Sequence, residues 1–329
     1  MQADAPDRVP DMPIGRSNFT PQQIQQLVSS VPIWFHSIEV GYGIVTPGAK
    51  SASLLAQEIA SLQLPDLRGK TVLDVGAFDG FYSFEAERLG AASVTALDHY
   101  MWSIDLVEHH RHWQECVERG LVPEPYHSMP YWRPNELPGK RGFDVASRLL
   151  ASKVRGVLGD FATMDLQPIG TFDVVLFLGV LYHLESPMEA LRRLASITGR
   201  VAVIETEAVF VPPFESRAMF EFFGSNELNN DVSNWWAPNI RALESMCLAA
   251  GFRRVVTIQG EPAYLRRLAS RVGRLVKPRV RRYRAVVQAW RWPLDPKATR
   301  SVQISTYDTP PFQACSAGLD IDDQPGWVG

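Results

Sequence analysis

The stretch from Lys70 to Phe84, KTVLDVGAFDGFYSF, constrains the fold of this chain more than any other. Thr71 to Val75 is apolar and β-branched with one carboxylate, which predicts a short buried strand, and residues 76–80 predict a tight turn. Residues 81–89 predict a helix that ends at Gly90. A strand, a glycine turn and a helix in this order form a corner suited to nucleotides, because helix N–H groups and glycine backbone face the ligand.

The turn differs from the one that binds dinucleotides. In G-x-G-x-x-G the middle glycine lets a pyrophosphate approach the backbone, and here that position is Phe78. The turn therefore suits a nucleoside that lacks a pyrophosphate better than it suits NAD. Asp74, inside the strand, favours a ligand that carries a positive charge or an amine.

Strands alternate with helices along the rest of the chain. Six further strands are predicted at residues 93–97, 154–158, 172–178, 201–204, 255–258 and 302–306. Helices are predicted after Thr20, over 51–62, after the capping box 186–189, and over 240–250 before Gly251; Thr20 forms a capping box with Gln23. This alternation predicts an α/β fold with a mostly parallel seven-stranded sheet covered on both faces.

The carboxyl ends of parallel strands share one edge of the sheet, where ligands bind. Asp98, 22 residues beyond Gly76, ends the second strand and suits a ribose diol. Asp160 and Phe161 follow the third strand, where they could bind the amino group and the ring of an adenine. Leu178, at the end of the fourth strand, could line its other face.

Four segments resemble the class I S-adenosylmethionine (SAM)-dependent methyltransferases. They are LDVGAFDG at 73–80, LFLGVLYHLESP at 176–187, VIET at 203–206, and WWAPN with AGF between 235 and 252. The resemblance covers about residues 34–252 and is nearest to the tRNA uridine-5-oxyacetic acid carboxymethyltransferases and related sugar and natural-product methyltransferases. It implies a Rossmann-like methyltransferase fold with SAM as cofactor. The cofactor contacts implied by the resemblance, or by the turn and its strand, are Lys50 (the loosest match), Asp74, Gly76, Phe78, Asp79, Gly80, Asp98, His99, Asp160, Phe161, Leu178 and Tyr182.

One departure bears on the methyl donor. The carboxymethyltransferases that this chain resembles hold the extra carboxylate of carboxy-SAM with a lysine upstream of the glycine turn and an arginine near the C-terminus. This chain has no lysine before Lys50, which matches a different lysine, and the arginine has no assignable counterpart. A buried carboxylate without a cationic partner costs several kcal/mol, so ordinary SAM is the expected donor.

A hydroxyl acceptor benefits from a general base. His183 is the first candidate, His36 the second, and Glu205 a carboxylate alternative. For each histidine a structural hydrogen bond is the competing interpretation. The three cysteines lack metal spacing, and of the histidines at 109, 110 and 112 only the first and last could share a helix face, so a solvated polar face and no metal site are expected.

Six tryptophans lie outside the predicted strands, in segments that would cover the ligand edge, and about half are expected to be core. They are Trp34, Trp102, Trp113, Trp132, Trp235 and Trp236. Flat aromatic faces suit sugars, aromatic rings and bases.

The 329 residues divide by composition. We expect a mobile N-terminus at 1–16, a cap segment at 17–69, a methyltransferase domain at 70–310 and a tail at 311–329. Within the domain, the insertion 99–150 is expected to cap the substrate and 260–300 to form a basic helical arm.

The net charge of −3 hides an asymmetry. Residues 253–300 carry 14 Lys or Arg and two acids, about +12, which leaves about −15 on the remainder. Such an arm could be a solvated helix or could bind an anionic substrate, RNA or a membrane surface. The start of the chain lacks an apolar run and an early basic cluster, so a cytoplasmic protein without a signal peptide or transmembrane segment is expected.

The sequence thus favours a SAM-dependent methyltransferase that acts on a hydroxyl of a small molecule or saccharide, with an anionic acceptor open. The alternative is an RNA-modifying enzyme of the tRNA wobble-uridine type that binds RNA through the basic arm. A third hypothesis is a SAM-binding regulatory protein without activity. The oligomeric state is left open.

Overall fold

The predicted strand–turn–helix corner is present in the computed structural model, which describes residues 18–292 except 123, 125, 212, 213, 215, 230 and 262–279. Strand β3 (Thr71–Val75) ends at Gly76, and helix α3 (Phe81–Arg88) follows the turn. Both Gly76 and Gly80 have positive φ angles, +77° and +89°, which side-chain-bearing residues rarely adopt. The turn therefore depends on its glycines.

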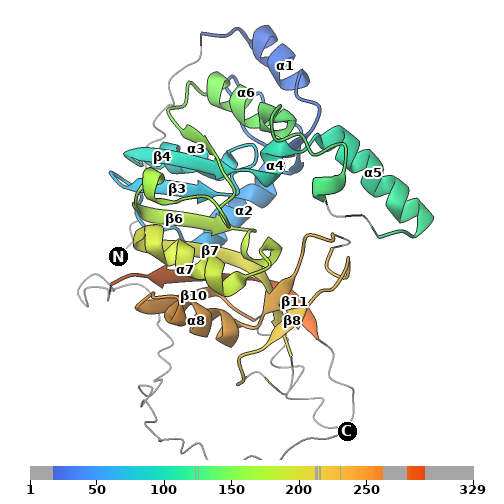
Figure 1. Ribbon diagram of the computed structural model, residues 1–329. Helices are drawn as coiled ribbons and strands as arrows, with labels where there is room; N and C mark the ends of the chain where they lie inside the picture. Colours follow the sequence, from blue (N-terminus) through green and yellow to red (C-terminus); the bar gives the residue numbers. More distant parts are fainter. Residues whose placement is uncertain are drawn as a thin grey trace, which may run out of the picture. The chain divides into compact units, whose positions relative to one another are not determined.

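Within the described residues, β3 belongs to a seven-stranded sheet of order β10-β11-β7-β6-β3-β4-β5 (Figure 1). The strands β3 to β7 of this sheet are parallel, and β11 is antiparallel to both β7 and β10. This is the predicted Rossmann-like α/β fold. The other strands of the sheet are β4 (Ser93–Asp98), β5 (Arg155–Leu158), β6 (Phe172–Leu178), β7 (Thr198–Phe210), β10 (Arg254–Gln259) and β11 (Arg281–Trp290).

The helices and two small sheets surround this sheet. The helices are α1 (Pro21–Ser29), α2 (Ala52–Leu62), α4 (Tyr100–Ser103), α5 (Leu106–Arg119), α6 (Arg141–Leu149), α7 (Pro187–Ile197) and α8 (Ile240–Ala249). Short 3-10 helices are η1 (Tyr126–Ser128), η2 (Pro138–Lys140), η3 (Gln167–Ile169) and η4 (Leu181–His183). The small sheets pair β1 (Trp34–His36) with β2 (Gly48–Lys50), and β8 (Phe220–Phe222) with β9 (Trp236–Pro238).

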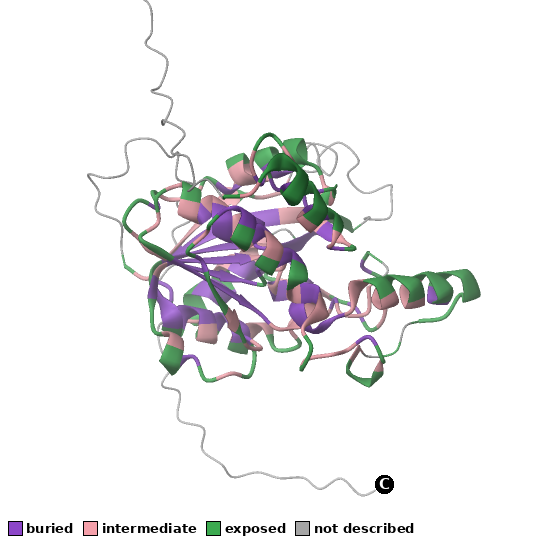
Figure 2. Ribbon diagram, turned by 90° about the horizontal axis from the view of Figure 1, so that it is seen from above, coloured by how far each residue is buried: buried purple, intermediate pink, exposed green. Residues whose placement is uncertain are grey.

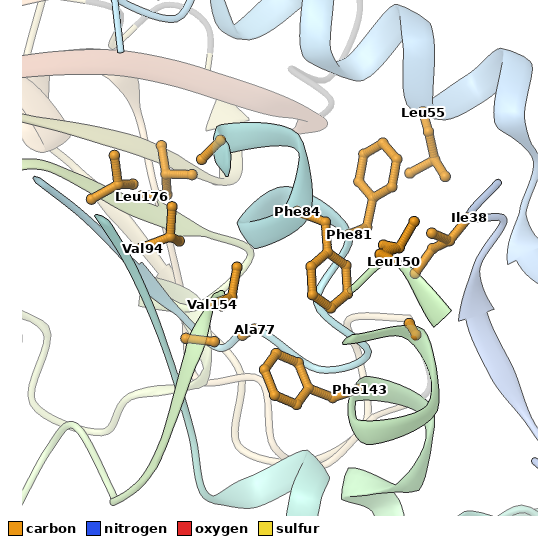
Figure 3. Packing of buried hydrophobic residues seen from close by; sticks show 14 of the residues in the cluster. Ile38, Leu55, Ala77, Phe81, Phe84, Val94, Phe143, Leu150, Val154 and Leu176 are labelled. Carbon is orange, nitrogen blue, oxygen red and sulfur yellow. The ribbon is translucent and has the colours of Figure 1, made fainter. Parts of the chain in front are cut away.

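Alternate residues of the strands point into two hydrophobic cores, as a period of two requires. Val72 packs in a core with residues of α1, α2, α3 and α6, whereas its neighbour Leu73 packs in a core with α7 and α8. Figure 2 shows the buried strands between helices whose outer surfaces are exposed. In the first core Phe84 of α3 stacks on Phe143 of α6 with ring centroids 5.6 Å apart (Figure 3).

Several predicted boundaries hold. Thr20 and Gln23 form the predicted capping box of α1, and Asn239 caps α8. Ser186 makes no side-chain capping bond to α7, so that capping box was wrong.

The seventh strand was misplaced. It is β11, inside the segment predicted as a helical arm, while 302–306 lies outside the described residues, as do 262–279 of the arm. The arginines near the start of β11 led to the helical prediction, but the segment is a strand that pairs with β7 over ten residues. The same pairing extends β7 beyond the predicted 201–204 to Thr198–Phe210.

Over the part of the chain that the structure describes, no helix has the length and apolar character needed to span a membrane.

Candidate active site

The turns after β3 and β6 approach each other closely at the carboxyl ends of the strands. A Cβ atom at Gly76 would lie 2.8 Å from Cγ2 of Val180. Gly80 has a different neighbourhood, since a Cβ there would meet the rings of Phe84 and Phe143 at 2.6 and 2.7 Å. Gly76 thus allows the two turns to meet, and Gly80 allows α3 to pack on α6.

Two buried carboxylates flank this turn. Asp98 accepts backbone N–H bonds from Phe78 (2.9 Å) and Met101 (3.0 Å), and Asp74 accepts the hydroxyl hydrogen of Ser83 at 2.6 Å. Burial raises the pKa of each carboxyl group to about 6. Asp98 lies at the tip of β4, the position that suits a ribose diol, and the buried Asp74 suits a cationic group.

Asp160 and Phe161 both have partners within the protein. The carboxylate of Asp160 accepts the N–H of Ala162 at 2.9 Å and the hydroxyl of Thr163 at 2.8 Å, which closes its own turn. The Phe161 ring, predicted to pack on an adenine, is only 5% exposed and lies 5.2 Å from the Phe177 ring in the second core. Hydrophobic burial therefore accounts for this ring without a ligand.

Asp79 fastens the N-terminal cap segment to the turn. Its carboxylate accepts the backbone N–H groups of Phe35 and His36 at 2.9 and 2.8 Å and forms a short contact with Nδ1 of His36. The His36 ring is buried and stacks on the Phe81 ring at 5.5 Å. These partners give His36 and Asp79 a structural role, which was the competing interpretation for His36.

Lys50 lies in a small polar cluster beside this contact. Its ammonium group donates to both oxygens of Glu58 at 2.9 Å, and the Tyr82 hydroxyl donates to Glu58 at 2.7 Å. Burial opposes ionisation of Glu58, but the hydrogen bonds from Lys50 and Tyr82 lower its pKa overall. Lys50 is therefore already paired with a carboxylate.

Glu205 is paired with a guanidinium. Arg284, from β11, makes two short bonds to Glu205 and an ion pair of 3.1 Å to Glu207. The same guanidinium lies 5.0 Å from the centroid of the Tyr182 ring. The guanidinium of Arg284 is thus paired with two carboxylates, and Glu205 is already engaged in an ion pair.

His183 lies at the end of a hydrogen-bonded chain. Its Nδ1 is 2.9 Å from the Ser233 hydroxyl and 3.2 Å from the Ser233 carbonyl oxygen, and the hydroxyl donates to Asp231 at 2.7 Å. Because the carbonyl can only accept, these partners assign the proton to Nδ1 and leave the lone pair on Nε2. Burial lowers the pKa of His183, which favours the neutral ring.

A cavity of about 1140 Å³ adjoins His183. Residues 160–163 after β5 line it, and so do three longer segments outside the sheet: residues 100–131 after β4, 183–190 after β6, and 223–235 after β7. Its walls are rich in aromatic side chains, namely Tyr100, Trp113, Tyr126, Tyr131, Phe223 and Trp235. The last segment is fixed to the second, because Trp235 N–H donates to the Tyr182 carbonyl at 2.8 Å. The cavity has the size and polarity of a small-ligand site.

The insertion after β4 supplies much of this wall. Tyr126 contacts the rings of Tyr100 (4.5 Å) and Trp132 (4.7 Å), and the His99 ring contacts Trp132 at 5.2 Å. The remaining predicted contact, Leu178, is the partly buried last residue of β6.

The histidines of α5 were predicted to form a solvated face. His109 and His112 do share one face, but both rings pack on Tyr131, at 5.0 and 5.7 Å. In the described residues there is no group of three or more His, Cys, Asp or Glu side chains that could hold a metal ion.

Of the six tryptophans, two are core, where about half were expected. Trp34 and Trp102 are buried in the first core, and Trp113 and Trp235 line the cavity.

Three residues at this site, Ser233, Asp231 and Tyr100, were not predicted from the sequence. The signal available was the fragment DVSN before WWAPN, which has the Asp and Ser spacing of a hydrogen-bonded turn. It did not indicate His183 as the partner, which lies 50 residues away in the chain.

Comparison with known proteins gives the following matches. A family model described as "Methyltransferase domain" matches residues 49–257. The tRNA U34 carboxymethyltransferase of Ectopseudomonas mendocina is 28% identical over 193 residues, which is 58% of this chain and 47% of that protein. The enzyme of the same name from Campylobacter hominis is 24% identical over 191 residues, 57% of this chain and 52% of that protein. The chain thus spans about half the length of these relatives.

Among solved structures, the N-terminal domain of EvdMO1, crystallised in the presence of S-adenosylhomocysteine (SAH) and D-fucose, is similar in fold. Its TM-score is 0.51 at 15% identity, over 83% of this chain and 97% of that chain. The same domain with SAH bound gives a TM-score of 0.50.

Proposed function

Because this chain belongs to the class I SAM-dependent methyltransferases, with SAM as its cofactor, we propose that it methylates a hydroxyl group of a small-molecule or saccharide acceptor. The acceptor would occupy the aromatic cavity beside His183. SAM supplies an activated methyl group on a sulfonium, so the protein must mainly orient the acceptor and manage its proton.

The residues at the strand ends fit this cofactor. Asp98 lies at the strand tip where ribose hydroxyls bind, the buried Asp74 suits the cationic part of the cofactor, and Gly76 keeps the turns after β3 and β6 in close contact. Asp160 can bind only with the oxygen lone pairs that its own turn leaves free. Phe161 would contribute its backbone, because its ring is buried.

One observation carries the choice of a hydroxyl acceptor: the neutral His183 ring on the cavity wall, held through Nδ1. Ser233 and Asp231 fix the ring orientation, and Nε2 remains to accept a proton from an acceptor hydroxyl. His36 and Glu205 are weaker candidates for the base, since each is already engaged with an oppositely charged or hydrogen-bonded partner.

The RNA-modifying alternative rests on the curated relatives, whose names specify tRNA U34. The cavity does not favour it, because among its described lining residues there is no Lys or Arg to contact phosphate. The same observation argues against an anionic acceptor. Two described arginines of the basic arm are also engaged within the protein, Arg282 with Glu221 at 2.8 Å and Arg284 with Glu205 and Glu207.

Radiolabelled SAM and an extract of the source cells test this function. After incubation and fractionation into RNA, lipid and small molecules, we expect the label in the small-molecule or saccharide fraction and its persistence after ribonuclease treatment. An acceptor activity that ribonuclease abolishes would support the RNA-modifying alternative instead.

The donor itself gives a further prediction. Arg284 of β11, whose guanidinium lies 5.0 Å from the centroid of the Tyr182 ring, is paired with Glu205 and Glu207, and Lys50 is paired with Glu58. Neither of these two described cations is therefore free to pair with the extra carboxylate of carboxy-SAM, and burying that carboxylate unpaired is costly. We expect SAM to raise the melting temperature more than an equal concentration of carboxy-SAM; a larger rise with carboxy-SAM would contradict this reasoning.

A further inference from the structure

The cavity beside His183 is lined by an excess of acidic side chains. Its lining carboxylates are Glu124, Asp160, Glu185, Glu189 and Asp231. Within the described lining there is no basic side chain other than histidine. A cleft lined by charges of one sign concentrates a field of that sign.

Three of these carboxylates have no cationic partner in the described part of the chain. Asp160 is bonded to an amide and a hydroxyl, and Asp231 accepts from the amide (2.8 Å) and hydroxyl (2.7 Å) of Ser233. Neutral donors leave the negative charge in place. Glu185 contributes its backbone carbonyl to the Trp236 indole at 3.0 Å, and the residue is exposed where it lines the cavity. Glu189 differs, since Arg192 lies 3.7 Å away.

The negative field reaches the aromatic wall. Burial raises the pKa of Tyr126 to about 12, and the charges of Asp160 and Glu185 add to that rise. Asp231 likewise adds to the upward shift that burial gives the pKa of Tyr100. Each carboxylate disfavours a further negative charge on the neighbouring ring, as like charges do.

Aromatic faces and carboxylates together favour cations. The rings of Tyr100 and Tyr126 meet edge to face at 4.5 Å, and Trp132 lies 4.7 Å from Tyr126. An ammonium group over such a face is attracted by the ring quadrupole, and a nearby carboxylate strengthens the attraction.

From this combination we infer that the acceptor carries a protonated amine in addition to its hydroxyl, as an amino sugar or an amino alcohol does. The amine binds between the aromatic wall and the carboxylates of Glu185 and Asp231. The hydroxyl faces His183. This inference rests on the proposed function, because the hydroxyl that receives the methyl group is part of it.

Matched sugars test the charge preference. Glucosamine, N-acetylglucosamine and glucuronate share one ring and differ in charge, and their binding to the full-length protein with SAH can be followed by ligand-observed NMR. We expect glucosamine to bind about tenfold more tightly than N-acetylglucosamine, and glucuronate more weakly than both. Higher salt should reduce the difference. Equal binding, a preference for the carboxylate, or no binding of the amine would overturn the inference.

A pair of variants locates the binding. Glu185→Gln should reduce the preference for glucosamine several-fold, whereas Glu118→Gln, on an exposed part of α5 outside the cavity lining, should leave it unchanged. Equal effects of the two changes would mean that the preference does not come from the cavity.

Transfer from 13C-methyl SAM separates this inference from the proposed function. The 13C chemical shift of a methylated amine-bearing product distinguishes an O-methyl from an N-methyl group. N-methylation of a cationic acceptor would support the inferred preference for an amine and contradict the proposed methylation of a hydroxyl. O-methylation of neutral acceptors alone would support the proposed function and contradict the inferred amine.

Discussion

Replacing His183 with Gln is expected to lower kcat by ~10²- to ~10⁴-fold, the range that a positioned general base contributes. Glutamine can keep a hydrogen bond to Ser233 but cannot take up a proton from the acceptor. SAM affinity should change little, because the strand ends that suit the cofactor are separate from the Ser233 contact. Steady-state kinetics with SAM titration distinguish the two quantities.

His127→Gln is the matched control. His127 also lines the cavity, but its ring contacts are with Tyr126 and Trp132, outside the chain from His183 to Asp231. Its loss should change kcat by less than about fivefold. Equal losses for both variants, or full activity of His183→Gln, would show that His183 is not the base.

The pH profile offers a second test on the wild-type enzyme. A base must be neutral, so the rate falls as pH drops through the folded pKa of His183. Burial puts that pKa below the ordinary value of 6.5. The acid limb of kcat should therefore lie below pH 6.5 and should be absent from the residual activity of the Gln variant.

Gly48→Ala is expected to destabilise the protein by ~3 kcal/mol or more, at the upper end of overpacking effects. A Cβ at this position would lie 2.1 Å from the carbonyl carbon of His36 and 2.4 Å from the amide nitrogen of Ser37. These are backbone atoms in and next to β1, the strand paired with β2, so the β1–β2 pair must separate. Asp79 would then lose its contacts with the cap segment. Urea unfolding measures the loss.

Gly43→Ala separates this clash from the cost of losing a glycine. Gly43 has φ +71°, and a Cβ atom there would meet nothing within 4 Å, so its change should cost only ~1–2 kcal/mol. If the two variants were equally stable, backbone contact at Gly48 would not hold the cap segment in place.

The corner of the fold was predictable because its residues are neighbours in the chain. Residues 71–75 and 172–178 became strands with the predicted bounds, since an apolar run between turn signals is a local pattern. β11 was not predictable in this way. Arg282 and Arg284 look like parts of a basic helix until Glu221 and Glu205, 61 and 79 residues away, are found beside them.

The candidate site likewise has one part that local sequence patterns indicated and one part that they did not. The proposed nucleoside end consists of the turn after β3 and the tips of neighbouring strands, for which pattern and spacing indicated Gly76 and Asp98. The acceptor end depends on pairs such as His183 with Ser233, which no local pattern connects. Asp79 illustrates the converse: its position in the turn suggested a ligand, and its partner is the backbone of the cap segment.

The four segments that line the cavity all leave the sheet, after β4, β5, β6 and β7. Their sequences can therefore change in evolution while the strands and the strand ends stay the same. Chains that resemble this one across the sheet are expected to share its donor and to differ in what they methylate. Homologues should accordingly be grouped by residues 100–131 and 223–235 before an acceptor is transferred from one to another.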